Sequence, residues 1–130
     1  MSAYLIDTRV WLWMQTDLSR VRASVLELLA SADNDRLVSA ATVWEIAIKY
    51  DVGKLALPQP PDVYLRDRLR DSATTVAPID LDDAVRAAGL PLHHKDPFDR
   101  MIVAQAQLLG LPLVTVDPVM KKYDIDIIDA

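Results

Sequence analysis

Short β-forming apolar segments alternate with segments of helical periodicity along almost the whole chain, and this alternation restricts the possible folds more than any other feature. Two strands separated by a helix normally pair in parallel, because the helix must cross back over the sheet. We therefore expect an α/β fold with a parallel sheet and helices on both faces. The strands expected from the pattern are Ala3 to Ile6, Arg36 to Val38, a Thr-Thr-Val segment around residue 75, Pro112 to Val116 and Asp126 to Ile128.

The helices between these strands have recognisable first and last residues. Asp96-Pro97 precedes the most clearly delimited helix, Phe98 to Leu109, which Gly110 ends. The other helices are expected at Thr8 to Met14, through Val21 to Leu29 with an end at Asp33, at Ala40 to Tyr50 with Gly53 as the stop, at about Asp62 to Asp71, and at Leu81 to Ala88 after Asp80.

Length and composition limit the class of protein. With 130 residues, 52% of them hydrophobic, we expect a single domain over residues 1–130. The lack of cysteine excludes disulfides, a thiolate nucleophile and zinc-thiolate sites. The first seven residues have no basic region or long apolar run, and no segment offers about 18 consecutive uncharged apolar residues. We expect a cytoplasmic protein without a membrane partner.

The charge of the chain is acidic in an unusual way. A net charge of -5 argues against a general phosphate-binding surface. Of the 19 acidic residues, however, 17 are Asp, and only Glu27 and Glu45 are Glu. Short carboxylates suit helix caps, turns and hard-metal ligation. A cation bound by several of them would reduce the repulsion of a phosphate substrate.

Four acidic residues are expected at the ends of core elements: Asp7, Glu45, Asp99 and Asp117. Asp7 and Asp117 each follow an expected strand, and ligands bind beyond the carboxyl ends of strands in an open parallel sheet. Converging carboxylates must share protons unless a divalent cation separates them. Mg²⁺ keeps several waters in such a site, and one of them can attack a phosphodiester. The set therefore indicates metal-dependent hydrolysis.

Several of these acids also have a purely structural interpretation, which the sequence leaves open. Asp7 suits the cap of the first helix, and Asp96 suits an N-cap before Pro97. Asp117 suits a turn before Pro118. Asp96 is thus as readily a cap as a ligand.

Two further features bear on whether residues near these acids belong to the site. The segment from Thr42 to Glu45 imitates a capping box, but Ser39 suggests that the helix has already begun there. His93 and His94 lack the i, i+4 spacing of a helical metal-binding pair, so a flexible loop is the favoured interpretation.

The chain resembles the VapC-type PIN-domain toxins in a series of motifs that covers nearly its whole length. These motifs are Tyr4 to Thr8 (YLIDT), Ser39 to Lys49 (SAATVWEIAIK), Gly53 to Leu55 (GKL), His93 to Ala106 (HHKDPFDRMIVAQA), Leu113 to Asp117 (LVTVD) and Tyr123.

This resemblance implies a three-layer α/β/α PIN fold with a central, mostly parallel sheet of about five strands. It also implies a toxin component of a type II toxin–antitoxin system: a Mg²⁺- or Mn²⁺-dependent endoribonuclease with RNA as substrate and a VapB-like antitoxin as partner. The metal-binding acids would be Asp7, Glu45, Asp99 and Asp117, with Asp96 close enough to help.

The resemblance also suggests roles for three neighbouring residues. Thr8 would orient Asp7 or a metal-bound water. Arg100 is the positive residue that the family carries after its third acid. Arg9 stands where this subgroup commonly has His, so its role stays open between a substrate phosphate and an acidic partner.

Two other functions are compatible with part of this pattern. A phosphoryl-transfer enzyme with Asp7 as nucleophile would want a second Asp two residues later, where Arg9 stands. A degenerate PIN or receiver-like binding module would retain the acids only as caps. The presence of all four acids favours the nuclease, and RNA cleavage that is lost on chelation would separate it from the module.

Association is expected from the high apolar content together with three tryptophans. We expect a homodimer, and an antitoxin segment in an apolar groove near Trp11, Trp13 and Trp44.

Overall fold

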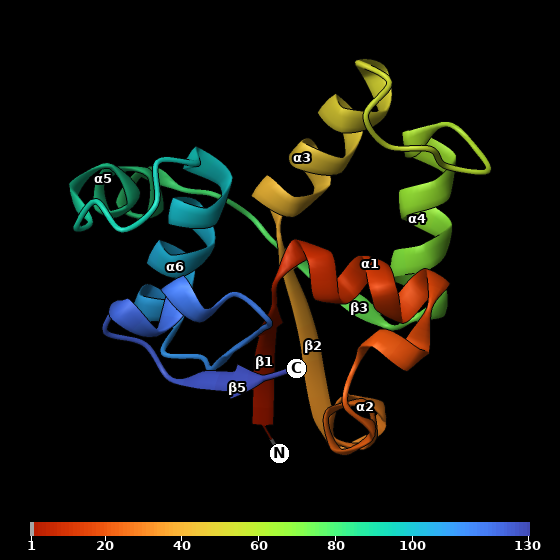
Figure 1. Ribbon diagram of the computed structural model, residues 1–130, viewed down its shortest axis with the longest axis horizontal. Coiled ribbons are helices and arrows are strands. Elements are labelled where there is room, and N and C mark those ends of the chain that lie inside the picture. The colour runs from red at the N-terminus through yellow and green to blue at the C-terminus, as the bar shows by residue number, and fades with distance from the viewer. Residues whose placement is uncertain (1) are drawn as a thin grey trace.

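The computed structural model describes residues 2–130 and contains a five-stranded sheet in the order β3-β2-β1-β4-β5, in which every neighbouring pair is parallel (Figure 1). The expected α/β class is confirmed, and the sheet, expected to be mostly parallel, is entirely so over these residues. The strands are β1 (Ser2–Ile6), β2 (Asn34–Ser39), β3 (Thr74–Ala77), β4 (Leu113–Thr115) and β5 (Ile127–Asp129).

The helices lie close to their expected positions. α1 continues two residues beyond its expected end and stops where the Asp17 side chain accepts a hydrogen bond from the Ser19 N–H. No helix within residues 2–130 is long and apolar enough to cross a membrane. The helices are α1 (Thr8–Thr16), α2 (Ala23–Ala30), α3 (Ala40–Asp51), α4 (Pro61–Asp71), α5 (Leu81–Gly89) and α6 (Pro97–Leu109), with 3₁₀ turns η1 (Leu18–Arg20) and η2 (Pro118–Lys122).

The sheet separates two hydrophobic cores, which gives the three-layer arrangement. In Figure 1, α1, α2 and α4 lie on one side of the sheet, α5 and α6 lie on the other, and α3 stands beyond the ends of β1 and β2. Consecutive residues of β1 serve different cores: Leu5 packs with residues of α5 and α6, and Ile6 packs with residues of α1 to α4. Because both faces are covered there, consecutive residues are buried at the carboxyl ends of β1 and β2 and throughout β4.

The three tryptophans lie in different environments, so the groove expected near all of them is wrong. Trp11 is fully buried in the core beneath α1, where its Nε1–H donates to Thr74 Oγ1 at 3.3 Å. Trp13 is half-buried against the same core. Only Trp44 is strongly exposed, at 62%, with its ring edge-on to Phe98 at 5.3 Å. An amphipathic helix buries its apolar face on the sheet, and in α1 that face contains Trp11.

Candidate active site

A cleft of about 520 Å³ opens at the carboxyl ends of β1 and β4, between α3 and α6. We call it the acidic cleft, because five carboxylate side chains line it. They come from segments far apart in the sequence, and the parallel topology brings their ends to the same edge of the sheet. The structure thus brings together all the acids singled out from the sequence: Asp7, Glu45, Asp96, Asp99 and Asp117.

Asp7 is both a helix cap and a buried member of the acidic cleft. Its Oδ1 accepts from the Thr8 N–H at 2.8 Å at the start of α1. Its Oδ2 accepts from the Thr115 hydroxyl at 2.6 Å. Burial raises the pKa of Asp7; the hydrogen bonds from Thr115 and Thr8 oppose this rise, and the nearby charges of Asp117 and Glu45 add to it.

Asp117 also caps a helical turn while it faces the acidic cleft. Its Oδ1 accepts from the Val119 N–H at 2.9 Å, and its Oδ2 lies 2.8 Å from His94 Nε2. Burial opposes ionisation, but the hydrogen bonds from His94 and Val119 and the charges of His94 and Arg9 leave the pKa of Asp117 below its ordinary value. These contacts therefore favour the carboxylate form of Asp117.

Glu45 caps no helix. α3 begins at Ala40, and the Ser39 side chain caps it by accepting from the Ala41 N–H at 3.0 Å. This confirms that the helix has already begun before Thr42, so the apparent capping box does not form. Glu45 is 7% exposed, and its Oε2 accepts from Lys49 Nζ at 2.7 Å, one turn further along the helix.

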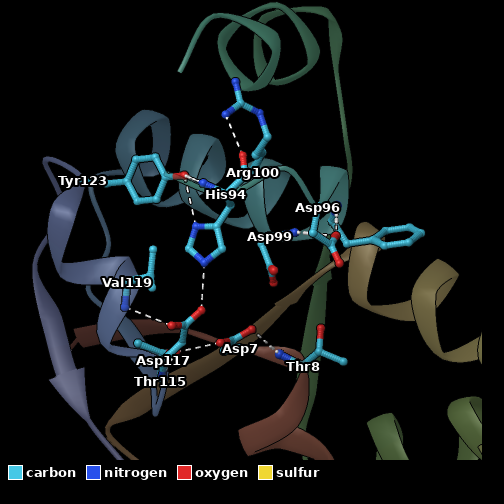
Figure 2. A network of polar contacts seen from close by, with 11 residues as sticks. Asp7, Thr8, His94, Asp96, Asp99, Arg100, Thr115, Asp117, Val119 and Tyr123 are labelled. Atoms are coloured by element: carbon cyan, nitrogen blue, oxygen red, sulfur yellow. Dashed lines mark hydrogen bonds and ion pairs between the residues drawn. The ribbon is translucent and has the colours of Figure 1, made fainter. Parts of the chain in front are cut away.

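Asp96 and Asp99 lie at the start of α6. Asp96 is exposed and caps the helix, accepting from the N–H groups of Phe98 at 2.8 Å and Asp99 at 3.3 Å. The Asp99 carboxylate points towards Asp7 and Asp117 (Figure 2). Burial, together with the charges of Asp96, Asp7 and Glu45, raises the pKa of Asp99 to about 7, against a smaller opposing effect of His94.

This raised pKa predicts a pH-dependent stability of the metal-free protein. The folded state binds a proton at Asp99 that the unfolded state releases near pH 4, so the stability falls as pH rises from about 4 through 7. We expect the Tm in chelator to be lower at pH 8 than at pH 5.5, and Asp99→Asn to remove most of the difference. The exposed Asp33→Asn variant is the control. A wild-type Tm that rises across this range would contradict the prediction.

The three residues assigned to support or substrate differ in their positions. The Thr8 hydroxyl lies 2.8 Å from that of Thr42 and links α1 to α3, while the Thr8 backbone N–H holds Asp7. Arg9 is exposed and lines the acidic cleft. Arg100 points away from the cleft (Figure 2), and its guanidinium donates to the carbonyls of Ala88, Leu90, Pro91 and His94.

The flexible-loop interpretation is wrong for His94. Its side chain is only 11% exposed, with Nε2 at Asp117 and Nδ1 3.0 Å from the Tyr123 hydroxyl. The sequence could not predict these contacts, because residues in an irregular loop follow no periodic pattern. Thr115 was also missed, although its place at the carboxyl end of the expected strand, two residues before Asp117, could have drawn attention to it.

The donors present suit a hard cation that keeps part of its water shell. Among residues 2–130, no three Asp, Glu or His side chains are close enough to form a complete ready-made metal site. Thr115, Lys49 and His94 engage the carboxylates instead. All five acids offer oxygen. Burial and, after it, repulsion by the neighbouring carboxylates raise the pKa of Asp99, and a divalent ion relieves that repulsion. Mg²⁺ and Mn²⁺ fit this donor set.

Known proteins resemble this chain in sequence and in fold. The PIN domain family model matches residues 4–126. Over 62 residues the chain is 45% identical to Ribonuclease VapC16 from Mycobacterium tuberculosis, an alignment that covers 45% of this chain and only 43% of that protein. The aligned part therefore spans less than half of that curated relative.

Two crystal structures have a similar fold. One is that of VapBC2 from Rickettsia felis bound to a DNA fragment from their promoter, with a TM-score of 0.72, 18% identity and coverage of 98% of both chains. The other is that of FitAcB from Neisseria gonorrhoeae, with a TM-score of 0.66, 23% identity and coverage of 97% of this chain and 96% of that one. At these identities the likeness concerns the fold alone.

Proposed function

Because this chain belongs to the PIN-domain family, we propose that it is a VapC-type toxin of a type II toxin–antitoxin system, an endoribonuclease that hydrolyses RNA phosphodiesters with Mg²⁺ or Mn²⁺. The observation that carries the proposal is the position of Glu45. Asp7, Asp96 and Asp117 each cap a helix, so caps alone would explain them. Glu45 caps nothing, yet it is buried in the same cleft.

In the proposed site, different residues bind the ion and orient its ligands. Asp7, Glu45, Asp99 and Asp117 would hold the ion, and Asp96 lies in the same cleft as a further oxygen donor. The chemistry that a divalent ion supplies is the activation of water at neutral pH and the neutralisation of charge developing on the phosphate. Thr115 and the Thr8 N–H fix both oxygens of Asp7, which leaves their remaining lone pairs for the ion.

Three basic residues at the acidic cleft would offset the negative charge of the protein for an RNA strand. Arg9, Lys49 and Lys54 all line it. At the end of α3, Gly53 has φ +77°, which a residue with a side chain adopts only with strain, and the Lys54 N–H then donates to Lys49 O at 2.8 Å. This turn keeps Lys54 beside Lys49. A local basic rim can attract phosphates even where the net charge is -5.

The alternative functions are less well supported. A phosphoryl-transfer site with Asp7 as nucleophile would want a second Asp two residues later, where the exposed Arg9 lines the cleft. A degenerate binding module would not need the buried Glu45.

The function is tested by incubating the purified, antitoxin-free protein with total RNA and mapping new RNA ends. Cleavage should require Mg²⁺ or Mn²⁺, stop with EDTA and return when excess Mg²⁺ is added. RNA that is bound but never cut would favour the module, and cleavage that resists EDTA would overturn the metal-dependent mechanism.

We also propose a VapB-like antitoxin and a homodimer as partners. The exposed Trp44 ring, edge-on to Phe98 between α3 and α6, offers an apolar surface for one of them. Sedimentation of the purified protein at tens of micromolar tests the dimer, and a monomer alone would exclude it in that range. The antitoxin proposal is tested by co-expressing this chain with the product of the adjacent gene and asking whether the two proteins co-purify through a tag on this chain.

A further inference from the structure

We propose that His94 is a positioning residue for the proposed metal site: its Nε2–H holds the Asp117 carboxylate in the orientation that the ion requires, and Tyr123 keeps the proton on Nε2. This inference rests on the proposed metal-dependent nuclease. The inference adds two residues outside the carboxylate set to the proposed site. It concerns how the Asp117 carboxylate is oriented before an ion binds.

The hydrogen bonds around Tyr123 determine the tautomer of His94. The Tyr123 hydroxyl accepts from the backbone N–H of His94 at 2.9 Å, so its own proton is free to point at the ring. It lies 3.0 Å from His94 Nδ1, which therefore accepts. A neutral imidazole in this arrangement carries its proton on Nε2, and a protonated ring has a hydrogen there as well, so in either form Nε2 donates to Asp117 Oδ2 at 2.8 Å. The two rings are nearly parallel, at 8°, with centroids 5.5 Å apart, which fixes the direction of this donor.

Asp117 depends on such a partner for a fixed orientation of its carboxylate. It follows β4, a strand of only three residues, and its side chain is 30% exposed. The Val119 N–H holds Oδ1, and His94 supplies the donor to Oδ2. With one donor on each oxygen the carboxylate has a defined plane, and its remaining lone pairs face the acidic cleft that Asp117 lines.

The imidazole is not needed merely to order the loop before α6. Arg100 already fastens that segment, because its guanidinium donates to the carbonyls of Ala88, Leu90, Pro91 and His94 at 2.9 to 3.2 Å. Arg100 thus holds the His94 backbone, whereas the His94 side chain reaches towards Asp117 (Figure 2). Groups that orient metal-ligating side chains in this way typically change metal affinity by about 10- to 100-fold when removed.

The test is calorimetric titration of the purified full chain with Mn²⁺. His94→Phe keeps a ring beside Tyr123 but removes both nitrogens, and we expect Mn²⁺ to bind it about 10- to 100-fold more weakly. His94→Gln restores an N–H donor near the position of Nε2 and should recover most of the affinity. His93→Phe is the matched control: His93 is exposed, its ring touches the edge of Tyr123, and it should bind Mn²⁺ as the wild type does.

A double-mutant cycle separates positioning from a structural role. If His94 acts through Asp117, His94→Phe should have little further effect on Mn²⁺ affinity in an Asp117→Asn background. An equal loss in both backgrounds would overturn the inference, and so would unchanged affinity in His94→Phe alone. If His94→Phe does not fold, as judged by its Tm in chelator, Tyr123→Phe replaces it with the same expected direction. A wild type that binds no Mn²⁺ would instead overturn the metal site of the proposed function.

Discussion

Asp99→Asn should abolish RNA cleavage while the protein stays folded. Asp99 points towards Asp7 and Asp117. Burial and the charges of three other carboxylates disfavour its ionised form and raise its pKa to about 7. An amide there removes the charge that attracts a divalent ion, so we expect the cleavage rate to fall by about 100- to 1,000-fold or more. The same change relieves repulsion in the metal-free state, and the Tm in chelator at pH 8 should be unchanged or higher.

The measurements are cleavage of a labelled RNA at fixed Mg²⁺ and calorimetric Mn²⁺ titration of the same preparation. Asp7→Asn should behave in the same way in both. Asp33→Asn, an exposed acid outside the cleft, controls for the loss of one negative charge and should retain activity. Full activity in purified Asp99→Asn or Asp7→Asn would show that the acidic cleft is not the catalytic centre.

Arg100→Met should cause the largest loss of stability among changes near the cleft. The guanidinium is 8% exposed and is the donor for four backbone carbonyls. Methionine fills much of the same space but leaves those carbonyls without this donor, so we expect the free energy of unfolding to fall by about 3 kcal/mol or more. Urea denaturation measures it. Arg66→Met is the control, because its ion pair with Asp62 is exposed and worth little.

A consequence for activity follows from the same substitution. The segment that Arg100 fastens carries His94, so Arg100→Met should also reduce cleavage at temperatures where the protein remains folded. An unfolding free energy equal to that of the wild type would show that the carbonyls find other donors, and that Arg100 does not stabilise the loop.

The sequence predicted the sheet well because its strands are buried on both faces. In β1 the apolar run Ala3 to Ile6 ends at Asp7, and apolar residues at helical spacing follow immediately. The order of the strands did not follow from the pattern. It depends on which crossover packs on which face, and only the pairing of β1 with both β2 and β4 settles it.

Asp7, Asp99 and Asp117 were predictable for a topological reason, since each stands at the end of a core element, whereas Glu45 lies within α3. The supporting contacts were harder to foresee. Asp99 and Arg100 are consecutive in a helix and therefore point about 100° apart, which favours different surroundings for the two side chains. That geometry was available in the sequence. The contact of His94 with Asp117 was not, because it depends on the path of an irregular loop.

The hydrogen bond between Asp7 and Thr115 joins residues 108 positions apart. During synthesis, β1 emerges from the ribosome before its neighbour β4 and before the carboxylate of Asp117. Contacts this distant also make folding slow. No nascent part of the chain that ends before residue 117 contains the whole carboxylate set, so the proposed cleavage site cannot assemble until Asp117 has been synthesised.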